Sequence, residues 1–201
     1  MEPGSAHRNA HEDLQYIRRT LAAAGNFSSL SGTGMVVTGV LALATVVANL
    51  RLTGAPWDPG ASPDRSLGLW GVLLVVSIAI GVWTSALKAR RTGQVFWSPV
   101  LRKALWGYAA GMALGAILTV GAIRTAQFAL LPEIWLGCYG AAMTAAGVMT
   151  VPAVRWMGIS FLALAAVAAW VPPGAQILVL GLGFGWLHIA FGAFIAWRHN
   201  G

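Results

Sequence analysis

Long apolar runs separated by short polar connections fill the chain from Phe27 to Trp197. Six of these runs are about 20 residues long, the length that an α-helix needs to cross a hydrocarbon core of about 30 Å. They are continuously apolar rather than alternating every second residue, which predicts helices and not barrel strands. The predicted spans cover residues 27–50, 67–87, 104–123, 133–151, 154–171 and 175–197.

A polar arm precedes the first span, and part of it, His11–Gly25, predicts a short amphipathic helix. Leu14, Ile17 and Leu21 recur there at helical spacing, with charged side chains between them. We expect this helix to lie at the membrane surface, and docking to a cytoplasmic partner is a second interpretation. The chain therefore divides into an arm, residues 1–26, and a six-helix membrane domain, residues 27–201.

Composition supports a membrane protein, because hydrophobic residues make up 57% of the chain and charged residues 9%, against about 25% charged in soluble domains. The net charge of +7 does not point to nucleic acid, since the basic residues lie beside the predicted spans. The single cysteine, Cys138, excludes an intrachain disulfide.

The distribution of basic residues predicts an orientation, because cytoplasmic loops of membrane proteins are rich in lysine and arginine. With a cytoplasmic N-terminus, ten basic residues fall inside and three outside. Those inside are Arg8, Arg18, Arg19, Lys88, Arg90, Arg91, Arg102, Lys103, Arg155 and Arg198, and those outside are Arg51, Arg65 and Arg124. Six spans then place both termini in the cytoplasm.

Tryptophans near the predicted span ends agree with this frame, because indoles favour membrane interfaces. We expect Trp57, Trp70, Trp135 and Trp170 at the outer boundary and Trp97, Trp106, Trp156 and Trp197 at the inner one.

Glycines at four-residue spacing predict close helix packing, because small residues let helix backbones approach each other in lipid. They are Gly107, Gly111 and Gly115 in the third span and Gly181 and Gly185 in the sixth. Packing within one chain is the first interpretation, and contact between copies of the chain is the second.

His188 is the one titratable residue that the sequence places near the middle of a span, and such residues are candidates for function. Ser77, Thr144 and Ser160 lie at similar predicted depth and are candidate hydrogen-bond partners, and Trp186 lies beside it in the sixth span. Three roles remain open: a structural hydrogen-bonded histidine, a proton or ligand site, and a metal or haem ligand.

Other chemical signals are absent from the sequence. No carboxylate falls in the middle of a predicted span, as a proton or sodium relay of a transporter would require. The sequence also has no HExxH motif and no phosphate-binding loop. We therefore predict no catalytic residue, no metal site and no enzyme, and the sequence does not specify a cofactor.

Three segments carry a resemblance to a known group of proteins. They are Asp13–Arg18, the region from Leu131–Pro132 to Val154–Gly158, and the close Gly185–Gly192 with Arg198–Gly201. The chain resembles uncharacterised small bacterial membrane proteins with six spans. This resemblance implies a multi-pass architecture in the bacterial cytoplasmic (inner) membrane and no particular reaction. Where such relatives carry a Pro-Gly turn before the first span, this chain has Ser28–Gly34.

These observations favour a non-enzymatic accessory or interaction component of the membrane. Its expected partners are the lipid bilayer and either another membrane or cytoplasmic protein or further copies of the chain. The alternative is a small transporter or channel for an apolar or weakly polar solute, with His188 and Trp186 lining the route. A further alternative is a pigment- or haem-associated membrane subunit.

Overall fold

Helices make up most of the part of the chain that the computed structural model describes, namely residue 14 and residues 30–53, 63–93 and 95–198. These ranges contain no strand. The helices are α2 (Gly32–Thr53), α3 (Pro63–Arg91), α4 (Pro99–Arg124), η1 (Phe128–Leu130), α5 (Leu131–Gly147), α6 (Pro152–Ala168), η2 (Pro173–Ala175), α7 (Gln176–Leu180), η3 (Gly181–Leu187) and α8 (His188–Arg198). The predicted arm helix lies outside the described residues, apart from Leu14.

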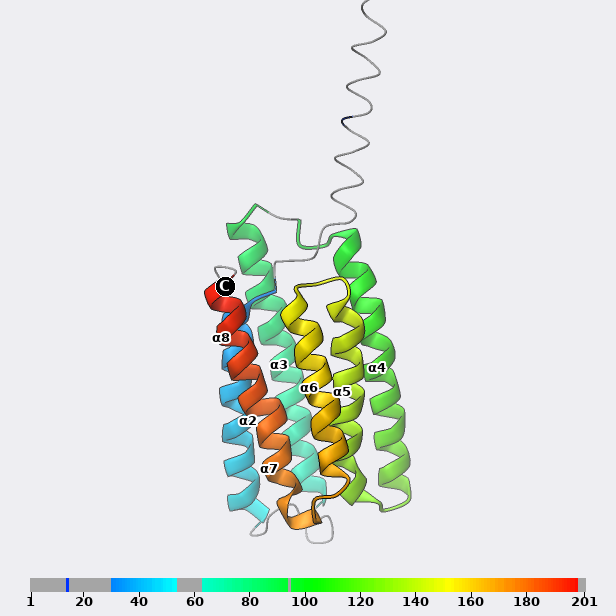
Figure 1. Cartoon of the computed structure of the whole chain (residues 1–201). Coiled ribbons are helices and arrows are strands. Elements are labelled where there is room, and N and C mark those ends of the chain that lie inside the picture. Colours follow the sequence, from blue (N-terminus) through cyan, green and yellow to red (C-terminus); the bar gives the residue numbers. More distant parts are fainter. Residues whose placement is uncertain (1–13, 15–29, 54–62, 94, 199–201) are drawn as a thin grey trace, which may run out of the picture.

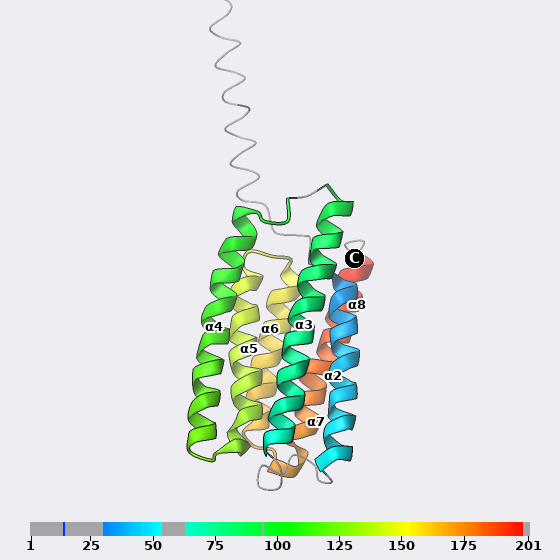
Figure 2. The same ribbon diagram turned by 180° about the vertical axis from the view of Figure 1, so that it is seen from behind.

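The helices stand side by side as an up-and-down bundle (Figures 1 and 2). The elements α7, η3 and α8 follow one another without a break and form one continuous rod. On one side of the bundle α4 packs on α5 and α5 on α6, and on the other side α2 packs on both α3 and α8. The segment from α7 to η3 contacts α2, α5 and α6, so it joins the two sides.

Four of these helices are long and apolar enough to cross a membrane: Gly32–Leu52, Asp64–Arg91, Pro99–Arg124 and Pro173–Arg198. The fourth and fifth predicted spans form α5 and α6, which have 17 residues each. Every predicted span thus overlaps a helix, with some boundaries shifted. For example, α4 begins at Pro99 rather than near Ala104.

Prolines mark where several helices begin, because a first-turn residue needs no backbone N–H donor. Pro63, Pro99 and Pro152 are the first residues of α3, α4 and α6. Before α4, the hydroxyl oxygen of Ser98 accepts a hydrogen bond of 3.1 Å from the backbone N–H of Leu101, which caps the helix.

The tight turn before Pro152 makes α5 and α6 antiparallel neighbours, and glycines set their separation. A Cβ atom on Gly140 would lie 2.8 Å from the backbone nitrogen of Leu162 and 2.9 Å from the carbonyl oxygen of Gly158. Gly158 approaches α5 equally closely, since its Cβ would lie 2.8 Å from the carbonyl oxygen of Gly140. No larger residue fits at either position without moving a helix.

The glycine motif of the third span packs within the chain. A Cβ atom on Gly111 would lie 2.8 Å from the Cβ of Ala142, and one on Gly115 would lie 3.0 Å from the Cβ of Cys138. Gly107 faces Ala145 in the same way, with its Cβ 3.4 Å from that of the alanine. The stripe therefore holds α4 against α5.

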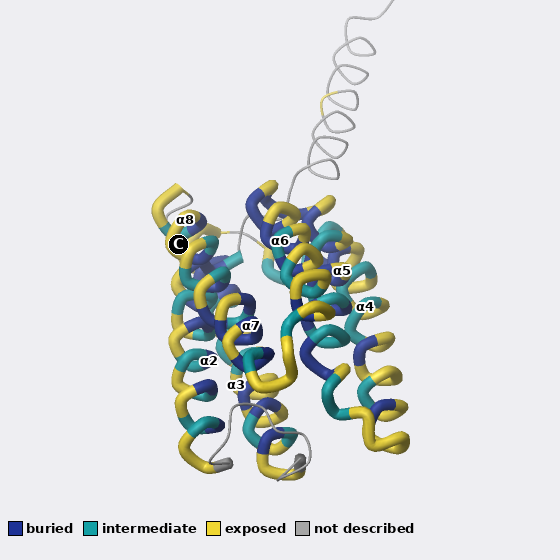
Figure 3. The backbone as a smooth tube through the Cα atoms, turned by 60° about the horizontal axis from the view of Figure 1, so that its bottom comes forward, coloured by how far each residue is buried: buried dark blue, intermediate teal, exposed yellow. Residues whose placement is uncertain are grey.

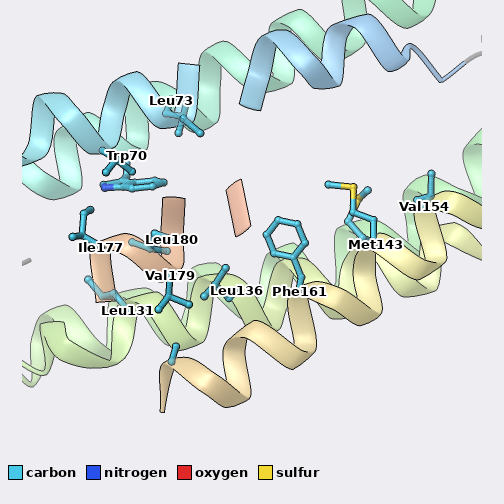
Figure 4. Close-up of a cluster of buried hydrophobic side chains, with 14 of the residues drawn as sticks. Trp70, Leu73, Leu131, Leu136, Met143, Val154, Phe161, Ile177, Val179 and Leu180 are labelled. Atoms are coloured by element: carbon cyan, nitrogen blue, oxygen red, sulfur yellow. The ribbon is translucent and has the colours of Figure 1, made fainter. Parts of the chain in front are cut away.

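Burial is uneven across the bundle (Figure 3). In the most apolar 18-residue stretch of the last rod, 44% of the residues are buried, whereas 11% are buried in the corresponding stretches of α3 and of α4. These two helices therefore expose apolar side chains around most of their circumference. The buried residues form a core between the two sides of the bundle, where Trp70 of α3 faces Ile177 and Leu180 of α7 (Figure 4).

Two tryptophans that we expected at the outer interface point into this core instead. Trp70 is 6% exposed, and its ring centroid lies 6.0 Å from that of Trp135 and 5.9 Å from that of Phe184. The indole N–H of Trp135 donates a hydrogen bond of 3.0 Å to the hydroxyl oxygen of Thr119 on α4. Packing across the bundle thus overrides the preference of these indoles for the interface.

The α5–α6 contact generates a prediction about stability. Gly140→Ala introduces a methyl group against backbone atoms, so we expect it to lower the free energy of unfolding by about 1–3 kcal/mol. Gly81→Ala on α3 is the matched control, because a Cβ there meets nothing within 4 Å. Thermal unfolding in detergent, followed by circular dichroism, measures both. Equal midpoints for the two variants would contradict close packing at Gly140.

Candidate functional site

The last rod contains a π-helix, η3, immediately before His188. Three glycines of this segment, Gly181, Gly183 and Gly185, are buried and lie against different neighbours. A Cβ atom on Gly181 would lie 3.3 Å from Cγ2 of Val46 on α2, whereas one on Gly183 would lie 3.1 Å from Cε1 of Phe161 on α6. The π-helix therefore sits between the two sides of the bundle, and His188 follows it in the interior.

His188 is 4% exposed and uses both ring nitrogens within the chain. Its Nδ1 lies 3.4 Å from the carbonyl oxygen of Gly183, and its Nε2 lies 2.8 Å from the hydroxyl oxygen of Tyr139 on α5. A carbonyl oxygen only accepts, so Nδ1 carries the proton in this arrangement. Burial among apolar rings disfavours a second ring proton, so the neutral imidazole accepts a hydrogen bond at Nε2 from the hydroxyl of Tyr139.

Aromatic rings surround this histidine–tyrosine pair. The ring centroid of Phe161 lies 4.8 Å from that of Tyr139 and 5.5 Å from that of His188. Phe184 lies 5.3 Å from Tyr139 and is stacked on His188 at 6.1 Å. Tyr108 of α4 completes the cluster, with its ring 6.2 Å from Tyr139 and nearly perpendicular to it. The pair thus links α5 to the last rod inside an apolar shell.

This geometry limits the chemistry of His188. With Nδ1 donating to Gly183 and Nε2 accepting from Tyr139, the imidazole has no lone pair left to bind a metal or haem iron. The described residues also contain no group of three or more histidine, cysteine or carboxylate side chains that could hold a metal ion. As arranged here, the pair is a structural hydrogen bond between two helices.

The expected partners of His188 were wrong, because each candidate hydroxyl is oriented otherwise. Thr144 donates to the carbonyl oxygen of Gly140 at 2.8 Å, and Ser160 donates to that of Trp156 at 3.0 Å, both within their own helices. The Oγ of Ser77 is buried and has no hydrogen-bond partner among the described residues. These residues lie at a depth similar to that of His188, but their side chains do not point toward it.

Trp186 and His188 do not line a common route. Trp186 is 58% exposed on the outside of the rod, while His188 is buried. Side chains that are two positions apart in a helix point in directions that differ by about 200°. Trp186 and His188 therefore lie on opposite faces of the rod although they lie at similar depth. Gly185, in contrast, packs inward, since a Cβ there would lie 2.7 Å from Cγ of Leu43 on α2.

The residue that sequence reasoning missed is Tyr139. The sequence places the hydroxyl group of Tyr139 in the middle of an apolar run. A tyrosine hydroxyl that is buried needs a hydrogen-bond partner, and this need could have identified the residue. Serine and threonine hydroxyls can turn back to their own helix, whereas a tyrosine hydroxyl lies too far from its backbone to do so. That difference makes Tyr139 a better candidate partner than Ser77, Thr144 or Ser160.

Comparison of the chain with protein families, with curated proteins and with solved structures finds no match.

The histidine–tyrosine bond generates a second prediction. Tyr139→Phe keeps the ring but leaves Nε2 of His188 without its donor, and hydrogen bonds between membrane helices contribute about 0.6–1.7 kcal/mol. We expect the free energy of unfolding to fall by about that amount. Tyr108→Phe is the matched control, since its hydroxyl makes no hydrogen bond to the described residues and its ring belongs to the same cluster. If Tyr108→Phe destabilises the protein as much as Tyr139→Phe, the bond does not stabilise the bundle.

Proposed function

We propose that this chain is a six-span protein of the bacterial cytoplasmic membrane with both termini in the cytoplasm. We further propose that it acts there as a non-enzymatic interaction component that binds another membrane helix. An exposed seam of small and β-branched residues along α3 is the observation that carries the second proposal.

The lengths of α5 and α6 are compatible with six spans. Each has 17 residues, which at 1.5 Å per residue extend about 26 Å. This is at the lower end of the range of about 17–25 residues for membrane helices. α5 packs against the longer α4, and α6 contacts the rod formed by α7, η3 and α8.

Charge at the two ends of the bundle supports the orientation. One end, where α3 ends and α4 begins, is called the basic end here (Figure 1). Its seven described basic residues are Lys88, Arg90, Arg91, Arg102, Lys103, Arg155 and Arg198. The opposite end has three described basic residues, Arg51, Arg65 and Arg124, together with the acids Asp64 and Glu133. The positive-inside rule assigns the basic end to the cytoplasm.

The seam on α3 has the spacing of a helix–helix contact. Gly68, Val72, Val75, Ala79 and Val82 follow one another at steps of four and three residues, and all five are exposed. This is the a/d pattern that lets two helices pack along each other. Nothing lies within 4 Å of a Cβ built on Gly68, and Val75 is 67% exposed. Lipid alone requires no such ordered row of small side chains, whereas a partner helix uses it for close approach.

The interior of the protein supports a binding role rather than catalysis or transport. Its one described buried histidine is bonded on both sides and packed by phenylalanines. Trp186, the other residue of the alternative transport route, faces outward. The features that remain available to a partner are therefore on the outer surface.

Topology is tested by fusing reporters to both ends of the chain. We expect green fluorescent protein to be fluorescent, and alkaline phosphatase to be inactive, at the N-terminus and at the C-terminus alike. This result follows from an even number of spans and from the cytoplasmic basic end. Reporters indicating opposite sides for the two ends would contradict the six-span topology.

Complex formation is tested by native electrophoresis of a tagged chain solubilised in mild detergent. We expect the chain to migrate as a complex, and Ala79→Trp to dissociate it because an indole in the seam separates the helices. Ile117→Trp is the matched control, since Ile117 is also exposed but lies on α4. Migration of the unaltered chain as a monomer, under conditions that preserve known complexes, would contradict the interaction role. A complex that survives Ala79→Trp would exclude the α3 seam as its interface.

A further inference from the structure

Lys88, in the last turn of α3, is the one described basic residue of the basic end that is buried, at 8% exposure. Its Nζ donates a single hydrogen bond, of 3.2 Å, to the carbonyl oxygen of Leu30 just before α2. An ammonium group has three N–H donors, so two of them remain without a partner among the described residues.

Hydroxyl groups collect around the same peptide. The backbone N–H of Ser31 donates to the Oγ of Ser85 on α3 at 3.3 Å, so α3 holds both sides of the Leu30–Ser31 peptide bond. The Oγ of Ser31 lies 2.9 Å from the Oγ1 of Thr33 and accepts a hydrogen bond of 3.2 Å from the N–H of Gly34. Ser31 is therefore the N-cap of α2, a helix of 22 residues.

The cap leaves further donors directed out of the helix. In an α-helix the first N–H groups have no acceptor within the helix. Here the amides of Gly32 and Thr33 bond to no described group, because the hydroxyl of Ser31 is used by Gly34. The positive end of the helix dipole thus lies beside a buried ammonium, and both favour an anion.

No described carboxylate balances this charge. The described acids, Asp64 and Glu133, lie at the opposite end of the bundle, and the other six described basic residues of the basic end add to the positive potential. A buried charge that has lost its hydrating water raises the free energy of the fold unless a counterion or other hydrogen-bond acceptors replace that water. Lys88 would gain from an anion that brings several acceptor oxygens at once.

We propose that Lys88, Ser31, Thr33 and the first amides of α2 bind a phosphate group at the basic end, most naturally that of an anionic phospholipid. Basic pockets between membrane helices on the cytoplasmic side bind such headgroups. This inference rests on the proposed membrane location. A chain that remains soluble without detergent would refute that location, whereas the experiment below tests the phosphate site in a chain that requires detergent.

The test uses the purified full-length chain, stripped of lipid in a neutral detergent and titrated while its thermal unfolding midpoint is followed. The three probes are phosphatidylglycerol, diacylglycerol with the same acyl chains, and inorganic phosphate. We expect phosphatidylglycerol to raise the midpoint and diacylglycerol not to. A rise with inorganic phosphate as well would show that the site takes free phosphate, and a rise with phosphatidylglycerol alone would show that it requires the lipid.

Variants identify the residues that bind. Lys88→Met removes a charge-assisted hydrogen bond, so we expect affinity for phosphatidylglycerol to fall at least about tenfold. Lys103→Met is the matched control, because this lysine is exposed at the same end, and we expect a loss of less than about fivefold. Thr33→Val, which removes one hydroxyl and no charge, should weaken binding about two- to tenfold.

Three results would overturn the proposal. The first is a midpoint that no phosphate-bearing probe changes, or that diacylglycerol raises as much as phosphatidylglycerol. The second is an equal loss of affinity in Lys88→Met and Lys103→Met, which would indicate general attraction to the basic end. The third is undiminished binding by Thr33→Val, which decides the matter if Lys88→Met does not fold.

Discussion

Close approach of helix backbones at glycines is the contact on which the rest of this bundle depends. Lipid is as apolar as a helix interface, so apolar side chains gain little free energy by moving from lipid into such an interface. Membrane helices therefore associate through close packing and hydrogen bonds. Gly140 and Gly158 bring α5 and α6 together, and a Cβ on Gly39 of α2 would lie 2.6 Å from the carbonyl oxygen of Gly185 in η3. These two contacts fix both sides of the bundle against their neighbours and so position the histidine–tyrosine pair between them.

Polar groups inside the bundle follow from the same constraint, because hydrocarbon offers them no partners. Eight described hydroxyls donate to the carbonyl oxygen four residues earlier, as Thr84 does toward that of Ile80 at 2.7 Å. His188 and Tyr139 satisfy each other between helices instead. Lys88 differs from them in carrying a charge that has no described counterion, and that imbalance is why the further inference is drawn there.

Much of the fold could be predicted from the sequence, whereas the site could be predicted only in part. The apolar runs located the helices, and the glycine spacing in α4 identified a packing surface, because both depend on neighbours along the chain. His188 was identified as a buried polar residue for the same reason. Its partner was not, since Ser77, Thr144 and Ser160 matched it in depth but not in direction. Tyr139 faces it because α5 and the last rod are held together by other residues.

The sequence by itself determined that the described chain is helical and apolar and that its basic residues gather at alternate connections. Hydrophobicity and charge are properties of single residues and need no fold to be read. The tertiary structure decided that Trp70 and Trp135 point inward, that a π-helix precedes His188, and that Lys88 is buried beside the N-terminus of α2. Each of these features depends on how one helix is rotated relative to its neighbour. That rotation is determined by the packing of side chains from both helices.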